Sequence, residues 1–346
     1  MENTKQTSQK KIWLNIVVVL VVLMILITVV GSLNDFEQIL HMIGQVNLIY
    51  LIIAIVLSLS SFLFMSLSTN IVLRALNKDI DYGTGFLIQT VEPFFNGITP
   101  FSTGAQPFQL YYYHKHNVPA NEATSVLVVN FILFQIVSVA LSTIGLIVFF
   151  NQIYSALGNM MVYILIGYII NTVILIGLFF LAYIPKVYIL FERLLGLFEK
   201  IKWTKNTATK LKAKTFRFVG EFQGGVRFLF TKKRVFILSS LTKLISIILL
   251  YSTTVLIAMS LSETFNWSES IFMIVSGLLA VTTMMFFPLP GASGGTEVAY
   301  TMLLGQMIPN LKLVTIMLLW RLLTYYFGMI YGFIGYLFLR KRKVKS

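Results

Sequence analysis

Long apolar runs alternate with short polar connections along the whole chain. Six runs are long enough to cross about 30 Å of hydrocarbon as helices, and they cover residues 12–30, 48–73, 124–150, 161–184, 235–261 and 311–339. Two further apolar stretches are interrupted by proline and glycine. This pattern predicts an all-α polytopic membrane protein, a single integral membrane domain over residues 1–346.

Composition and charge placement support this class and predict an orientation. The chain is 57% hydrophobic and only 12% charged, which excludes a soluble globular protein. Its formal net charge of +14 could indicate nucleic-acid binding, but nearly every Lys and Arg flanks an apolar run. This placement follows the positive-inside rule, so we expect both termini in the cytoplasm and no nucleic-acid partner.

A basic loop over residues 185–234 holds 13 of the 27 Lys and Arg residues, so we expect it in the cytoplasm. Apolar residues recur there at helical spacing, at Phe218, Phe222, Val226 and Leu229. This spacing predicts an amphipathic helix lying on anionic lipid headgroups. A solvated connector that serves only the topology remains the alternative.

No set of residues points to catalysis, a metal or a cofactor. The absence of cysteine excludes disulfides and thiolate sites. The stretch from Gly291 to Gly295 matches the nucleophile pattern Gly-x-Ser-x-Gly around Ser293, but no histidine follows it in the chain. We therefore expect no catalytic residue, no metal and no cofactor.

The two interrupted stretches share a motif. Pro100, Thr103 and Gly104 have the spacing of Pro290, Ser293 and Gly294. Their arms cover residues 85–98 and 106–113, and residues 271–287 and 298–308, each shorter than the ~20 residues of a full span. We expect two re-entrant helical hairpins, entered from opposite sides of the membrane. Two tilted short spans in place of a hairpin remain the alternative.

The hairpins define two units of opposite topology, at about residues 48–150 and 235–339. Paired broken segments in inverted repeats are typical of carriers whose site lies at the repeat interface near the midplane. The residues expected to form the gates of this site are Pro100, Gly104, Pro290, Gly294 and Gly295.

Charged residues are rare within the apolar segments, and an unpaired charge there costs roughly 2.5–3.5 kcal/mol. Arg321 and at least one of Glu92 and Glu297 should therefore face the bundle interior and be paired or solvated. Lys243 should extend to the cytoplasmic surface. A helix that begins near Gly295 would offer free N–H groups to a phosphate. The predicted substrate-binding residues are Glu297, Arg321, Glu92, Ser293, Thr296, Thr103 and Gln106, and a purely structural Glu–Arg pair is the alternative.

Three segments together resemble a known family. They are Asn96-Gly-Ile-Thr-Pro-Phe-Ser-Thr-Gly-Ala-Gln-Pro107, Pro288-Leu-Pro-Gly-Ala-Ser-Gly-Gly-Thr-Glu297 and Trp320-Arg-Leu-Leu-Thr324. They look like motifs of the lysylphosphatidylglycerol synthase transmembrane, flippase-like family. The resemblance implies that Glu297 and Arg321 correspond to an intramembrane Glu and Arg of that family.

The resemblance also implies a function. The best-known members flip aminoacylated phosphatidylglycerol to the outer leaflet, which lowers negative surface charge and gives resistance to cationic peptides. Those members carry a soluble synthase domain, whereas this chain ends at Ser346, directly after the last predicted span. We expect a lipid flippase or flippase-like carrier in a bacterial cytoplasmic membrane, with a membrane phospholipid as its substrate.

Two other functions remain open. One is a phosphatidylglycerol lysyltransferase-type enzyme component, and the other is a non-transporting membrane partner of a separate synthase. The lipid, the coupling ion and the oligomeric state are also left open, with a homodimer among the options.

Overall fold

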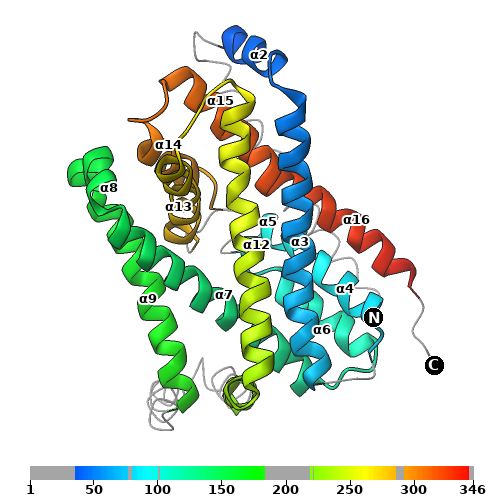
Figure 1. The fold of residues 1–346 in the computed structure, drawn as a ribbon. Coiled ribbons are helices and arrows are strands. Elements are labelled where there is room, and N and C mark those ends of the chain that lie inside the picture. Colours follow the sequence, from blue (N-terminus) through cyan, green and yellow to red (C-terminus); the bar gives the residue numbers. More distant parts are fainter. Residues whose placement is uncertain are drawn as a thin grey trace, which may run out of the picture.

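The computed structural model describes residues 36–76, 80–99, 102–183, 219–220, 222–285 and 292–342. The predicted first span, most of the basic loop, Pro100 and Pro290 lie outside these residues. Within them, every regular element is helical (Figure 1).

Six helical segments in the described part are long and apolar enough to cross a membrane. They are α3 (Leu48–Leu76), α7 (Ala120–Val148), α8 with α9 (Phe150–Tyr183), α12 (Lys233–Ser260), α13 (Trp267–Met284) and α15 with α16 (Asn310–Lys341). Five of them match predicted spans. The sixth, α13, was predicted as a hairpin arm that starts later. It begins at Trp267 because Asn266 and Glu269 cap its first turn reciprocally, with hydrogen bonds of 2.8 and 2.9 Å.

The centre of the fold is the pair of α3 and α12, which lie side by side and antiparallel (Figure 1). Small hydroxyl residues let the two backbones approach closely, as is common between helices in lipid. Ser246 Oγ donates to the Ser61 carbonyl at 2.9 Å, and Ser68 Oγ donates to the Ser239 carbonyl at 2.8 Å. These bonds satisfy the Ser246 and Ser68 hydroxyls at the interface.

Further helices flank this pair on both sides. In Figure 1, α5 (Glu92–Gly97) lies near the middle of the molecule, α4 (Tyr82–Thr90) and α6 (Ala105–Lys115) lie below it, and α13 with α14 (Gly295–Leu304) lies on the opposite side of the pair, toward the upper left. Helix α16 (Phe327–Lys341) packs against α4 and α5 through glycine. A Cβ at Gly332 would lie 2.7 Å from the backbone nitrogen of Phe94, so a larger residue would force α16 away.

Helix starts recur at two fixed separations along the chain. Residues 48 and 233, and 82 and 267, are 185 positions apart, whereas residues 105 and 295, and 120 and 310, are 190 apart. Backbone geometry recurs as well. Ser102 and Ala292 have φ of 50° and 52°, and Pro119 and Pro309 precede their helices with ψ of 141° and 140°. Helix starts and these backbone angles therefore recur at matched spacing, although α4 has 9 residues and α13 has 18.

The short helical stretch before α12 corrects one expectation. Phe222, Val226 and Leu229 are buried, and they pack against apolar residues of α7 and α9. The prediction that these residues form a membrane-facing apolar side is wrong, because the protein itself covers them. Phe218 and most of the basic residues of this loop lie outside the described part.

Candidate functional site: a buried ion pair at a helix junction

The first turn of α14 is held by its own glutamate. Glu297 Oε2 accepts a hydrogen bond of 2.7 Å from the backbone N–H of Gly294, which has no partner within the helix. Gly294 has φ of 87°, a conformation that favours glycine. One carboxylate oxygen of Glu297 is therefore fixed on the backbone, and the other can face a second group.

That second group is Arg321, at the end of α15 (Asn310–Arg321). Its Nε donates to Glu297 Oε1 at 2.6 Å, and the two side chains are only 7% and 8% exposed. Its Nη2 lies 3.4 Å from Ser293 Oγ, and its guanidinium lies 4.7 Å from the centroid of the Tyr325 ring. The expectation that Arg321 faces the interior, paired or solvated, is confirmed, and its partner is Glu297.

A π-helix follows Arg321 directly, over Leu322–Tyr326. Such single-turn π segments are frequent at functional sites. Ser58 Oγ in α3 donates to the Leu323 carbonyl of this turn at 3.1 Å. The Tyr325 hydroxyl donates to the Gly97 carbonyl, at the end of α5, at 2.8 Å. Residues 321–325 therefore contact both the start of α14 and the end of α5, and we call this place the junction.

The predicted gate glycines permit close backbone approach on both sides. A Cβ at Gly104 would lie 2.6 Å from the Phe95 carbonyl, and a Cβ at Gly295 would lie 2.9 Å from Met284 Sδ. Gly104 therefore excludes a larger residue at the start of α6, whereas at Gly295 a larger residue would require the flexible Met284 side chain to shift. Their role as gates stays a prediction.

Glu92 does not pair with Arg321. Its carboxylate hydrogen-bonds the side chains of Gln109 and Asn130 and is acted on by the charge of Lys243. Lys243 Nζ donates to Asn130 Oδ1 at 2.7 Å and is 1% exposed. The expectation that Lys243 extends to the membrane surface is wrong, because Asn130 satisfies its ammonium inside the protein. We call Glu92, Asn130 and Lys243 the lysine cluster.

The other predicted binding residues have different surroundings. Thr296 Oγ1 donates to the Ala292 carbonyl at 3.1 Å and so stabilises the start of α14. Thr103 is exposed near the start of α6. Gln106 is half-buried, and its Oε1 has no hydrogen-bond partner among the described residues. Across the described ranges, no group of three or more His, Asp or Glu residues could hold a metal ion.

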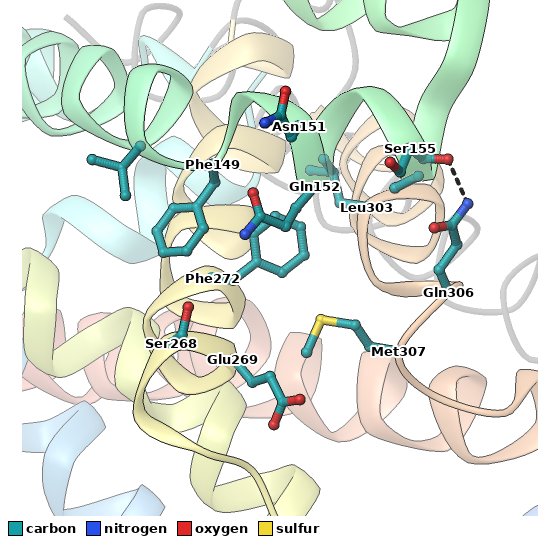
Figure 2. A pocket seen from close by; sticks show the side chains of 12 residues that line it. Phe149, Asn151, Gln152, Ser155, Ser268, Glu269, Phe272, Leu303, Gln306 and Met307 are labelled. Atoms are coloured by element: carbon teal, nitrogen blue, oxygen red, sulfur yellow. Dashed lines mark hydrogen bonds between the residues drawn. The ribbon is translucent and has the colours of Figure 1, made fainter.

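A cavity with a mixed polar and apolar lining, which the sequence did not predict, lies at the end of the molecule where α8 (Phe150–Leu157) is found. It has a volume of about 600 Å³, and Figure 2 shows side chains from α8, α13 and α14 around it. Asn151, Gln152 and Glu269 supply polar groups, and Gln306 donates to the Ser155 carbonyl at its rim. None of the predicted site residues lines it. The only sequence signal was a run of polar residues in the loop after residue 150.

The fold and the buried pair define the class: a polytopic helical membrane protein with a charged site at a junction of short helices. The family model for the lysylphosphatidylglycerol synthase TM region matches residues 12–332, so the chain belongs to this family. The match includes both motif-bearing segments, Glu297 and Arg321. A search of curated proteins gives no match.

Proposed function

We propose that this protein is a lipid flippase that moves an anionic or aminoacylated phospholipid between leaflets through the junction. The observation that carries the proposal is the position of Arg321. It bonds Glu297 at the start of α14, and four residues later Tyr325 bonds the end of α5. A headgroup bound at Arg321 would therefore contact both broken segments.

The repeating helix starts support an inverted-repeat carrier. In this proposal the units are residues 48–150 and 235–339, and α3 and α12 are their equivalent, antiparallel first helices. Helices α4, α5, α6 and α14 have 9, 6, 11 and 10 residues, each too short to span the bilayer. They suit re-entrant hairpins whose ends meet near the midplane.

The chemistry of the pair suits a phosphodiester. Arg321 makes a short bond to Glu297 but only a long 3.4 Å contact to Ser293. A phosphate oxygen is a stronger acceptor than a hydroxyl and would form a charge-assisted hydrogen bond there. An aminoacylated lipid also carries an ammonium group, which would neutralise Glu297. The phosphate of such a headgroup would bind Arg321 while its ammonium binds Glu297. Neither buried charge would then be left unpaired.

The expected cellular role follows from this substrate class. We place the protein in a bacterial cytoplasmic membrane, with both termini and the basic loop on the cytoplasmic side, where the loop would bind anionic headgroups. Moving an aminoacylated lipid outward would lower the negative charge of the outer surface and reduce the binding of cationic peptides.

The test is leaflet translocation of fluorescent phosphatidylglycerol and lysyl-phosphatidylglycerol by the purified protein in vesicles. We expect Glu297→Gln and Arg321→Ala to reduce the rate to that of empty vesicles. The matched controls are Glu263→Gln and Lys312→Met, which break a more exposed ion pair of 2.5 Å and should keep the rate.

Two outcomes would contradict the proposal. Wild-type rates from folded Glu297→Gln and Arg321→Ala proteins would exclude the site. A folded wild-type protein that translocates neither lipid would exclude the flippase function. Incubation with charged tRNA and phosphatidylglycerol should give no aminoacylated lipid; if product forms, the enzyme alternative holds.

A further inference from the structure

The lysine cluster contains buried ionisable groups that the proposed headgroup site does not use. Lys243 is 1% exposed, although an ammonium is strongly stabilised by water. Ionisable residues inside membrane segments usually face the bundle interior and mark pathways for substrates, ions or protons. The polar groups that surround Lys243 therefore indicate what it does.

Six helices contribute polar groups to this cluster and its surroundings. Thr69 of α3 donates to Asn130 Oδ1 at 2.8 Å, the same oxygen that accepts from Lys243. Further donors and acceptors come from Gln89 of α4, Glu92 of α5, Gln109 and Tyr113 of α6, Asn130 of α7 and Lys243 of α12. The titratable groups among these are Glu92, Tyr113 and Lys243; the groups from α3, α4 and α7 carry no charge.

The two charges of the cluster are separated by an amide. Asn130 accepts from Lys243 through Oδ1 and hydrogen-bonds Glu92, so that its Nδ2 serves as the donor. Glu92 is half-buried, whereas Lys243 is sealed from solvent. Glu92 is therefore the less buried residue of the two, and its negative charge depends on an ammonium with which it makes no direct ion pair.

We propose that Glu92 takes up and releases a proton coupled to lipid transport, and that Lys243 links this proton to the anionic headgroup. This inference rests on the proposed function. Before substrate binds, the Lys243 ammonium is the counter-charge of Glu92. A lipid phosphate that enters from the junction attracts the ammonium and weakens its effect on Glu92. A partly buried carboxylate without a cation favours its neutral form, so Glu92 takes one proton from water.

The charges balance in this step. One negative charge enters with the phosphate and one proton enters on a Glu92 oxygen, so the net charge of the cluster is unchanged. Release of the headgroup returns Lys243 to its former role, and the proton leaves to water. Burying an uncompensated charge is avoided throughout the cycle.

A proton suits the cluster better than a metal cation. The Asn130 oxygen that a cation would need already accepts from Lys243 and Thr69. A second positive charge would also be repelled by the ammonium. No cluster of His, Asp and Glu ligands is found among the residues that the structure describes.

The cluster and the junction are connected by one short helix. Glu92 begins α5 and Gly97 ends it, and the Gly97 carbonyl accepts the hydrogen bond of 2.8 Å from Tyr325. Tyr325 in turn contacts the Arg321 guanidinium. A headgroup that displaces Arg321 or Tyr325 would therefore act on the helix that carries Glu92.

The experiment measures protons taken up when lipid binds to the intact protein in detergent. Short-chain phosphatidylglycerol is titrated calorimetrically at pH 7 in two buffers with different ionisation enthalpies. We expect the wild-type protein to take up close to one proton per lipid bound. Glu92→Gln should bind the lipid with no linked uptake. The control Glu269→Gln changes a half-buried carboxylate at the start of α13, outside the lysine cluster, and should keep the uptake.

A second variant guards against misfolding. Glu92→Gln leaves Lys243 without its counter-charge, so Glu92→Gln/Lys243→Met, which removes both charges, is measured beside it. Binding without proton uptake in the wild type, or unchanged uptake in either folded variant, would overturn the proton proposal. Lipid-linked uptake without translocation would contradict only the flippase function. A wild-type protein that binds no lipid would contradict both.

Discussion

The protein buries two sets of opposite charges, and they are built differently. In the junction, Arg321 and Glu297 touch at 2.6 Å, and both side chains are almost inaccessible. In the lysine cluster, Asn130 lies between Lys243 and Glu92, and the two charged groups make no direct ion pair. Direct contact fixes both charges, whereas an intervening amide leaves the carboxylate free to change its protonation.

Helix geometry strengthens this difference. Glu297 is tied to its own helix start through the Gly294 N–H, so its charge also stabilises the local backbone. Glu92 starts α5, whose first turn contains a proline, and has no comparable bond to its own helix in the described structure. We conclude that the first pair is suited to hold a headgroup and the second to respond to it.

The largest effect is expected from Arg321→Ala, because it leaves the buried Glu297 carboxylate without its cation. Removing one member of a buried pair costs about 3–5 kcal/mol, which thermal unfolding in detergent should show as a clear loss of stability. Glu297→Gln/Arg321→Met should recover most of the stability but none of the translocation. A single variant as stable as the wild type would contradict the tight pairing.

A smaller loss is expected from Lys243→Met. Glu92 keeps its hydrogen bonds to Gln109 and Asn130 and can be protonated, so the cost should be nearer the roughly 1–3 kcal/mol of an unsatisfied polar group. A double-mutant cycle should give a weaker coupling between Glu92 and Lys243 than between Glu297 and Arg321. Equal couplings would remove the distinction between the two sites.

Asn130→Asp should convert the separated pair into a direct one. The introduced carboxylate would contact Lys243 and also face Glu92, and two carboxylates that share one cation cannot both remain charged. Glu92 should then be protonated before lipid binds, so proton uptake per lipid should fall by at least half. Unchanged uptake in the same two-buffer calorimetry would show that Asn130 does not set the charge of Glu92.

The smallest effect is expected from Tyr325→Phe. This change removes the 2.8 Å hydrogen bond to Gly97 but keeps the ring beside Arg321. We expect a loss of about 0.5–1.5 kcal/mol in stability and a severalfold lower translocation rate. If proton uptake also falls while lipid affinity is kept, Tyr325 links the two sites; if only stability falls, its role is structural.

Much of the membrane architecture could be predicted from the chain. Apolar run length predicted five of the six candidate spans in the described part. The cost of an isolated charge in lipid predicted that Arg321 would face the interior, paired or solvated, and it is paired. Both inferences depend on local properties, namely the length of an apolar run and the presence of one charge. These properties can be recognised in the sequence without knowledge of tertiary contacts.

The missed features depend on tertiary contacts. Nothing near Lys243 in sequence shows that Asn130, 113 positions away, accepts its hydrogen bond. The π-helix after Arg321 has no sequence signature of its own, and the cavity near α8 joins segments from three parts of the chain. The burial of Phe222 and Val226 was missed for the same reason, since an amphipathic pattern does not say whether lipid or protein covers its apolar side.

The most direct measurement of the central claim is crosslinking by a phosphatidylglycerol whose headgroup carries a photoreactive diazirine. After illumination in vesicles, mass spectrometry identifies the modified residues. We predict headgroup crosslinks in residues 292–297 and 321–325, competed by unlabelled lipid and lost in Arg321→Ala. Crosslinks confined to lipid-facing positions such as Ile330, which is 57% exposed, would contradict a headgroup site at the junction.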